Sequence, residues 1–339
     1  MISSIFLTIL TFSISFILIK FLIINYQKLK LADIPGVRSS HKIVKPRVGG
    51  LGIFISIFIF WGIFLLKDGF STKDITLLVS TIFIFMIGFF DDLYDLNPKL
   101  KMIFQFIITI MTFSIILSNY QLWVIFILVT YVMWIMNSFN FMDGIDTFSG
   151  LQAIPIFICY FLITMNYIPL LVAASLLAFL RFNYPPALTF MGDAGSLPLG
   201  YLIGVFPLCY FFSTPGVMSS QADKQLLLII SFIALCNTTF LFDSSITILK
   251  RALNKKNVFK PHREHLYQKA FDKGVLEIVI SGYNFSLTIL SSTCAIYLFY
   301  SSFKWQWLVY LLFACIFSLA YWIFFKQILN VDNPVKKLQ

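Results

Sequence analysis

Long apolar runs, separated by short polar segments, make up most of this 339-residue chain. A helix that crosses a bilayer needs about 20 mostly apolar residues, so the pattern predicts an all-α, polytopic membrane helix bundle of about 11 transmembrane helices. The predicted spans are residues 2–25, 50–66, 75–90, 102–118, 122–136, 151–167, 169–182, 197–212, 226–249, 275–300 and 306–325. The first run has no basic n-region and no A-x-A site, which favours a retained helix over a signal peptide. We therefore treat residues 1–339 as a single transmembrane domain.

The composition supports this interpretation. Hydrophobic residues make up 59% of the chain and charged residues 12%, and the mean hydropathy is +0.88. Soluble domains carry about 25% charged residues, so a soluble enzyme, a disordered protein and a disulfide scaffold are excluded. All five cysteines fall in apolar runs without a CxxC pair, so neither a zinc site nor a disulfide framework is indicated.

The distribution of positive charge predicts the orientation of the bundle. The net charge is +10, and twenty of the 25 lysines and arginines lie in alternate loops, those after spans one, three, five, seven and nine, and in the C-terminal tail. The opposite loops hold four, Lys67, Lys73, Lys224 and Lys304. Cytoplasmic loops of membrane proteins are enriched in Lys and Arg, so the first set is predicted to be cytoplasmic and the N-terminus to face outward.

Most of the other chemically active side chains fall on the same predicted face. They are Asp91, Asp92, Asp95, Asn137, Asn140, Asp143, Asp146, Asn183, Asp193, His262 and His265. The opposite loops are short and carry almost no such groups. This asymmetry predicts a functional site at the cytoplasmic face.

The segment GFFDDLYDLNPK places two neighbouring aspartates at the mouth of the third span. If the helix continues, Asp91 and Asp95 share one face, while Asp92 points about 100° away. Such like charges need neutralising, and Mg²⁺ typically uses one or two carboxylates together with substrate phosphates. The alternative is a solvated acidic turn at the interface.

Two further segments carry polar side chains between spans. In NSFNFMDGIDTFSG, Asn140 and Asp143 would present an amide and a carboxylate together, although such segments are also ordinary helix connectors. In FNYPPALTFMGDAGSLPLG, the two prolines should end a helix and Asp193 should open the next one. A helix start favours phosphate, Asp193 could hold a cation, and Phe190 could stack on a nucleobase.

The longest predicted cytoplasmic loop is basic and contains His262 and His265. Two histidines without cysteines are a poor zinc signature, so contact with phosphate is the preferred interpretation. A basic loop is also a common topology signal. Asp243 is a charge inside a span and therefore a functional candidate; the alternatives are a structural pairing with Arg251 or a polar contact between helices. The first loop adds Arg38, His41, Lys45 and Arg47, which suit a polyanionic substrate.

Together these motifs resemble the polyprenyl-phosphate N-acetylhexosamine-1-phosphate transferases, the MraY/WecA-like family also known as glycosyltransferase family 4. The motifs that carry the resemblance are DDLYDL at 91–96, NSFNFMDGID at 137–146, FMGDAGS at 190–196 and HREHLYQ at 262–268, in the family's order. The resemblance covers roughly residues 33–270. It implies transfer of a sugar 1-phosphate from a UDP-sugar to undecaprenyl phosphate, with release of UMP and a requirement for Mg²⁺, for which Mn²⁺ is a candidate substitute.

The resemblance also implies roles for individual residues. Asp91 and Asp92 match the catalytic aspartate pair, with Asp92 also predicted to share the metal with Asp193, and His265 matches the first histidine of the family's histidine motif. The residues implied in binding the substrates are Asn140, Asp143, Asp146, Asn183 and Phe190, and we add Arg47, His262 and Arg263 as neutralising groups.

Positions at which this sequence differs from the family's motifs indicate which sugar is transferred. Asp95 stands where the branch that makes peptidoglycan precursors carries lysine, which argues against a muramoyl-pentapeptide substrate. Tyr267 and Gln268 replace histidines of other branches, and Thr147 replaces a glycine. The form of the histidine motif is similar to the WbpL-like subgroup, which starts O-antigen or capsule synthesis with FucNAc or QuiNAc; GlcNAc is the other candidate.

The predicted location is the inner membrane of a bacterium, with the site facing the cytoplasm. The predicted partners are the UDP-sugar, the lipid acceptor and the bilayer, without nucleic acid, and a homodimer is a candidate assembly. The alternative function is a carrier or flippase for lipid-linked sugars. It would need ionisable groups near the bilayer midplane and preferably an internal repeat, and we find no convincing repeat.

Overall fold

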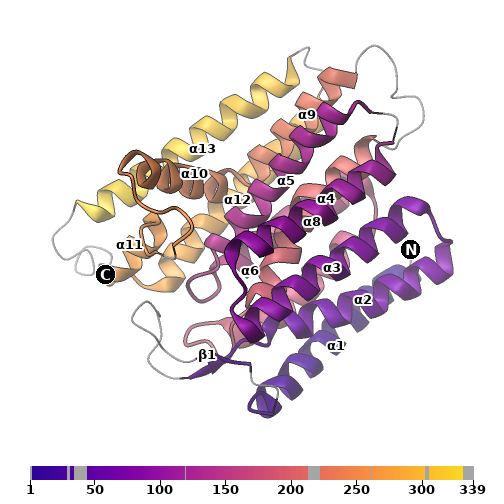
Figure 1. Cartoon of the computed structure of the whole chain (residues 1–339), viewed down its shortest axis with the longest axis horizontal. Helices are drawn as coiled ribbons and strands as arrows, with labels where there is room; N and C mark the ends of the chain where they lie inside the picture. Colours follow the sequence, from indigo (N-terminus) through magenta and orange to yellow (C-terminus); the bar gives the residue numbers. More distant parts are fainter. Residues whose placement is uncertain are drawn as a thin grey trace.

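The computed structural model describes residues 2–28, 31–33, 44–118, 120–212, 222–260, 262–301 and 305–330. Within these ranges the chain forms thirteen helices and one small antiparallel sheet (Figure 1). The helices are α1 (Ile2–Asn25), α2 (Gly49–Asp68), α3 (Thr72–Tyr94), α4 (Pro98–Ile116), α5 (Leu122–Phe141), α6 (Phe148–Thr164), α7 (Ile168–Asn183), α8 (Asp193–Phe212), α9 (Ala222–Cys236), α10 (Thr238–Leu253), α11 (Leu266–Asp272), α12 (Glu277–Phe299) and α13 (Gln306–Leu329). The strands are β1 (Ala32–Asp33) and β2 (Lys45–Pro46).

The helices confirm the predicted fold class. Seven of the described helices are long and apolar enough to cross a membrane, or eight if the bent pair α9 and α10 counts as one span. Helices α6 and α7 are apolar but shorter, and α8 contains Pro198 and Pro207. The protein is thus an all-α, polytopic membrane protein, and each of the eleven predicted apolar runs lies on helical chain.

The ninth predicted span differs from the prediction in shape. Residues 226–249 form two helices that meet at an angle of 87°, with Asn237 at the junction. The Asn237 amide donates to the Ile233 carbonyl at 3.0 Å and the Thr238 hydroxyl donates to the Ala234 carbonyl at 3.0 Å. Asn and Thr side chains that bind nearby backbone weaken and bend helices, which a count of apolar residues does not detect.

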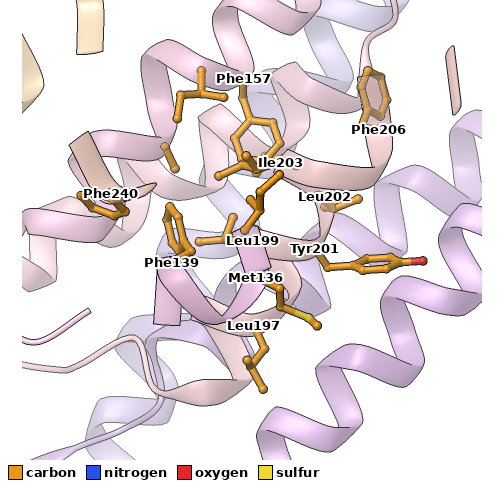
Figure 2. Packing of buried hydrophobic residues seen from close by; sticks show 14 of the residues in the cluster. Met136, Phe139, Phe157, Leu197, Leu199, Tyr201, Leu202, Ile203, Phe206 and Phe240 are labelled. Carbon is orange, nitrogen blue, oxygen red and sulfur yellow. The ribbon is translucent and has the colours of Figure 1, made fainter. Parts of the chain in front are cut away.

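Helix α8 lies at the centre of the bundle and packs against α3 and α5. Figure 2 shows its apolar side chains, among them Leu199, Ile203 and Phe206, interleaved with residues from neighbouring helices. The buried Tyr201 hydroxyl is 2.8 Å from the Thr112 hydroxyl of α4, so the polar end of this ring is satisfied inside the apolar core. This packing fixes α8 and with it the position of its first residue, Asp193.

Glycines allow the backbones to approach closely where α8 begins. A Cβ atom added to Gly88 of α3 would lie 2.1 Å from the Asp193 carbonyl oxygen, and one added to Gly50 of α2 would lie 2.3 Å from the Gly195 nitrogen. Small residues at such crossings permit tight helix packing in membranes. The end of α3 and the start of α8 are therefore held in direct contact.

Several chain segments meet at the end of the bundle where α3 finishes. Figure 1 shows β1, α10 and α11 at this end, with the last turn of α13 nearby and the first turn of α1 at the opposite end. The sheet joins Asp33 to Lys45, and the Pro46 carbonyl accepts a hydrogen bond from the Phe190 nitrogen at 2.9 Å. The residues before α2 are thus tied to the loop before α8.

Candidate functional site

The carboxylate of Asp92 binds the start of α8. Its two oxygens accept hydrogen bonds from the backbone nitrogens of Asp193, at 3.0 Å, and Ala194, at 2.9 Å. A helix start presents unpaired N–H groups and a partial positive charge, so a carboxylate is stabilised there. The preceding Gly192 has a φ of 71°, and a Cβ there would lie 2.6 Å from an Asp92 oxygen. Asp92 therefore fixes the loop that carries Asp193.

Asp91 and Asp193 share one positive charge. The Lys101 ammonium, in the first turn of α4, lies 2.9 Å from Oδ2 of Asp91 and 2.7 Å from Oδ2 of Asp193. The other Asp193 oxygen accepts a hydrogen bond from the Asn140 amide of α5 at 2.8 Å. Residues far apart in the sequence thus form one cluster, which we call the aspartate cluster: Asp91, Asp92, Lys101, Asn140 and Asp193.

Lys101 is a member of this cluster that sequence reasoning missed, because it was counted only as a topology signal. The available signal was its position, one turn after Asn97 caps α4 and one turn before Gln105. Gln105 is a fully buried polar residue in an otherwise apolar run, and it accepts a hydrogen bond from the Asn137 amide at 3.0 Å. Asn97, Lys101 and Gln105 recur every four residues, so they share one polar helix face, and this pattern indicates a buried polar site.

The oxygen ligands suit a hard divalent cation. Asp91 and Asp193 both contact one ammonium, so a single cation can lie between them, whereas both Asp92 oxygens are engaged by backbone nitrogens. Across the described part of the chain, no group of three or more His, Cys, Asp or Glu side chains could hold a metal. Mg²⁺ commonly takes one or two carboxylates and completes its shell with water and substrate phosphates. The sequence predicts Asp193 and Asp92 as the metal ligands, which nothing in the structure tests; because both Asp92 oxygens are engaged by backbone nitrogens, Asp91 is the better candidate for the second ligand.

The second polar group surrounds Phe190. The Lys45 ammonium lies 5.0 Å from the centre of the Phe190 ring and 3.8 Å from Oδ2 of Asp146. Asn183 accepts a hydrogen bond from the Thr147 nitrogen at 2.7 Å and donates one to the Thr189 carbonyl at 2.9 Å. Asn183 and Asp146 are both buried, and their contacts hold together the loops around Phe190.

Asp143 lies in the turn between α5 and α6. Burial raises the pKa of Asp143 to about 7, although a hydrogen bond from the Ser149 hydroxyl opposes this rise. The predicted pairing of Asn140 with Asp143 on one helix face is not seen, because α5 ends at Phe141. Asn140 turns to Asp193, while Asp143 turns to Ser149.

Arg47 lies beside the same end of the bundle and is paired. Its guanidinium contacts Asp33 at 2.6 Å. Burial opposes the charged form, but Asp33, with smaller contributions from Asp92 and Asp193, raises the pKa of Arg47 above its usual value. Arg47 therefore adds positive charge facing the aspartate cluster. Arg38 and His41 lie outside the described residues.

Residues 262–268, which we call the histidine loop, pack on the end of α5. The Tyr267 hydroxyl donates to the Phe141 carbonyl at 3.0 Å, and His265 is only 2% exposed. The His262 ring stacks on His265 with centroids 5.0 Å apart. Burial lowers the pKa of His262 to about 4, and the nearby His265 and Arg251 add to this, so the His262 ring is neutral at pH 7. It can offer a hydrogen bond to phosphate but no charge.

Arg263 pairs with Asp272 at 2.7 Å within its own loop, and its predicted contact with substrate stays a prediction. Two other arrangements considered from the sequence are not formed. Asp95 does not share a helix face with Asp91, because α3 ends at Tyr94 and Asp95 adopts a left-handed conformation with φ 50°. Asp243 does not pair with Arg251, which binds Glu264 instead.

Comparison with known proteins finds a family model that matches part of the chain. The family model described as glycosyl transferase family 4 matches residues 75–211. The matched segment contains Asp91, Asp92, Lys101, Asn140, Asp143, Asp146, Asn183, Phe190 and Asp193, whereas the histidine loop lies beyond it.

Several curated relatives extend the likeness over most of the chain's length. A Bacillus subtilis protein named "Probable undecaprenyl-phosphate N-acetylglucosaminyl 1-phosphate transferase" is 29% identical over 289 residues, 78% of this chain and 77% of the relative. A Thermotoga maritima "Undecaprenyl-phosphate alpha-N-acetylglucosaminyl 1-phosphate transferase" is 23% identical over 316 residues, 91% and 94% of the two chains. A Staphylococcus epidermidis "Phospho-N-acetylmuramoyl-pentapeptide-transferase" is 28% identical over 287 residues, 73% and 84%.

Proposed function

We propose that this protein transfers an N-acetylhexosamine 1-phosphate from a UDP-sugar to undecaprenyl phosphate and releases UMP. The observation that carries the proposal is the meeting of Asp91, Asp193 and Lys101 at one end of an apolar helix bundle. At such a position a polyprenyl tail can stay in lipid while its phosphate meets a soluble nucleotide. The names of the relatives support the same reaction class.

In the proposed reaction, an oxygen of the lipid phosphate attacks the sugar-bearing phosphorus of the UDP-sugar. A new P–O bond forms, the bond to the bridging oxygen breaks, and UMP leaves with that oxygen. Two phosphate charges about 4 Å apart repel by roughly 4 kcal/mol at an effective dielectric of 20, so cations are needed beside them. Lys101 and Arg47 supply positive charge from this chain.

Mg²⁺ is the proposed cofactor, with Mn²⁺ as a substitute. Asp91 and Asp193 would hold it, together with phosphate oxygens, and Asp92 orients Asp193 through the start of α8. When bound, the ion neutralises the charge that develops on the leaving phosphate. Phe190, beside Lys45, would stack on the uracil base of the donor.

Asp91 has two chemical routes open to it. As a base it removes a proton from the lipid phosphate, and as a nucleophile it forms a covalent phosphoryl intermediate. Incubation with a radiolabelled UDP-sugar in the absence of lipid acceptor distinguishes them. Label bound to the protein, with release of UMP, supports the covalent route.

The sugar and the pathway are the finer part of the proposal. We propose GlcNAc or one of its 6-deoxy relatives, FucNAc or QuiNAc, as the first membrane step of O-antigen, capsule or other envelope polysaccharide synthesis. Asp95, exposed at the end of α3, is an acidic side chain where the pentapeptide branch carries lysine. We further propose that the site faces the cytoplasm of a bacterial inner membrane.

The test is transfer of radiolabel from a panel of UDP-sugars into the lipid phase of membranes that contain the protein. The panel holds UDP-GlcNAc, UDP-FucNAc, UDP-QuiNAc and UDP-MurNAc-pentapeptide. We expect lipid-bound label from at least one of the first three, with an equal amount of UMP, and loss of both in Asp193→Asn. Movement of preformed lipid-linked sugar across the membrane without UMP would instead support a carrier.

A further inference from the structure

A second buried carboxylate lies outside the aspartate cluster, on α10. Asp243 is fully buried, and its oxygens accept hydrogen bonds from the Leu266 nitrogen at 3.0 Å, the Tyr321 hydroxyl at 2.9 Å and the Thr247 hydroxyl at 3.1 Å. The Tyr267 nitrogen lies 3.3 Å from Oδ2. All these partners are donors, so the carboxylate acts purely as an acceptor.

The remaining partner of this carboxylate is the His265 ring. Nδ1 of His265 lies 3.3 Å from Oδ1 of Asp243. A neutral imidazole carries one proton, on either nitrogen, and the hydrogen bond made by one nitrogen decides the tautomer. In the neutral ring, a carboxylate that only accepts hydrogen bonds places the single proton on Nδ1 and leaves Nε2 unprotonated.

The histidine is linked to the aspartate cluster through the end of α5. The rings of His265 and Phe141 have centroids 6.3 Å apart, and Phe141 directly follows Asn140, which binds Asp193. The Tyr267 hydroxyl holds the Phe141 carbonyl at 3.0 Å. Asp243, the histidine loop and the end of α5 therefore form one connected unit.

We propose that Asp243 is a positioning residue, which sets the tautomer and orientation of His265 so that Nε2 is the nitrogen presented to the substrates. The proposal rests on the proposed function for its catalytic consequence, but its structural part, the protonation of Nδ1, stands by itself. The bend at Asn237 is what brings Asp243 to the loop, because α10 turns away from the direction of α9 by 87°.

A purely structural role is the competing explanation. Asp243 also satisfies backbone N–H groups at the start of α11, as a capping side chain does, and a cap contributes about 1 kcal/mol. A cap alone predicts that loss of Asp243 lowers stability without changing the state of the His265 ring. The two explanations therefore differ at the imidazole nitrogens.

The first experiment reads the tautomer directly and does not depend on activity. The sequence holds three histidines, His41, His262 and His265, so ¹⁵N-histidine labelling gives few signals in solid-state NMR of the full chain in lipid vesicles. His265→Gln identifies the His265 signals. We expect a protonated Nδ1 and an unprotonated Nε2 in the wild type, and loss of this pattern in Asp243→Asn. A protonated Nε2 in the wild type, or no change in Asp243→Asn, would overturn the proposal.

The second experiment is a double-mutant cycle on transfer. Removing a group that orients a functional histidine typically costs 10- to 100-fold, so kcat of Asp243→Asn should fall about 10- to 100-fold with KM little changed. In a His265→Gln background the same substitution should have no further effect on kcat. An equal fall in kcat in the wild-type and His265→Gln backgrounds would show that Asp243 acts only structurally.

The matched control is Tyr321→Phe. It removes one donor to the other Asp243 oxygen and leaves the His265 contact in place, so kcat should stay within about twofold of the wild type. If Asp243→Asn does not fold, the His265 tautomer is measured by NMR in the wild type and in Asp243→Glu instead. If the wild type transfers no sugar phosphate, the proposed function fails, while the NMR result still decides the tautomer.

Discussion

At the scale of single residues, the aspartates near the site differ in their binding partners, although the sequence alone does not distinguish them. Asp92 binds the start of α8, Asp91 and Asp193 share the Lys101 ammonium, and Asp143 is held by Ser149. The sequence predicted that carboxylates would gather, because they fall in loops on one predicted face. It could not predict which partner each one takes, since that depends on the packing of α3, α4 and α8.

Lys101→Met tests the charge balance of the aspartate cluster. Without the ammonium, Asp91 and Asp193 face each other uncompensated, and breaking a buried ion pair costs up to about 3–5 kcal/mol. Because these side chains are 15–23% exposed, we expect a smaller loss. Thermal unfolding in detergent should occur at a lower temperature than in the wild type, and millimolar Mg²⁺ should raise it more in the variant.

The control for this prediction is Lys101→Arg, which keeps the positive charge. Its unfolding temperature and its response to Mg²⁺ should remain near those of the wild type. If Lys101→Met unfolds like the wild type and responds equally to Mg²⁺, the two carboxylates do not depend on a shared cation.

At the scale of elements, the sequence predicted which segments are helical but did not predict where the helices end or bend. The apolar runs predicted the helices, because membrane spans require continuous apolar surface. The shared face considered for Asp91 and Asp95 required α3 to continue past Tyr94, which it does not, and the single span predicted at residues 226–249 is wrong because two helices meet there at 87°. Each difference lies where polar side chains bind local backbone, as at Asn237, or where the chain takes a left-handed turn.

Gly88→Ala tests whether the contact between α3 and α8 holds the site together. The added Cβ would overlap the Asp193 carbonyl oxygen, 2.1 Å away, so the helices must separate. Overpacking costs about 1–3 kcal/mol, and here it also strains the hydrogen bonds that Asp92 accepts from the backbone nitrogens at the start of α8. We expect transfer activity to fall at least tenfold, together with a lower unfolding temperature.

Gly62→Ala on α2 is the matched control, because a Cβ there meets nothing within 4 Å. Alanine is the better helix former by about 1 kcal/mol, so this variant should be as stable as the wild type or more stable. If both alanine variants retain full activity, the close approach at Gly88 does not position Asp193.

At the scale of the whole molecule, the bend between α9 and α10 decides which residues can act together. It keeps α10 and α11 at the end of the bundle where α3 finishes, so the histidine loop reaches α5. The sequence placed these segments on one predicted face through the distribution of positive charge. The neighbours within that face could not be derived, because helix order in space does not follow from hydropathy.

The last prediction concerns the side of the membrane on which the site lies. Single cysteines are introduced at four exposed positions in a chain whose five native cysteines are replaced by serine. Tyr94, 71% exposed, and Leu253, 73% exposed, mark the predicted inner face, and Phe70, 63% exposed, and Tyr300, 65% exposed, mark the outer face. Transfer activity of each variant confirms that it folds.

Because twenty lysines and arginines lie in one set of loops and four in the other, a membrane-impermeant thiol reagent should label Phe70→Cys and Tyr300→Cys in intact spheroplasts. Tyr94→Cys and Leu253→Cys should react only after the membrane is opened. Labelling of Tyr94→Cys and Leu253→Cys from opposite sides would separate Asp91 from the histidine loop by a bilayer. The aspartate cluster and His265 could then not act on one substrate.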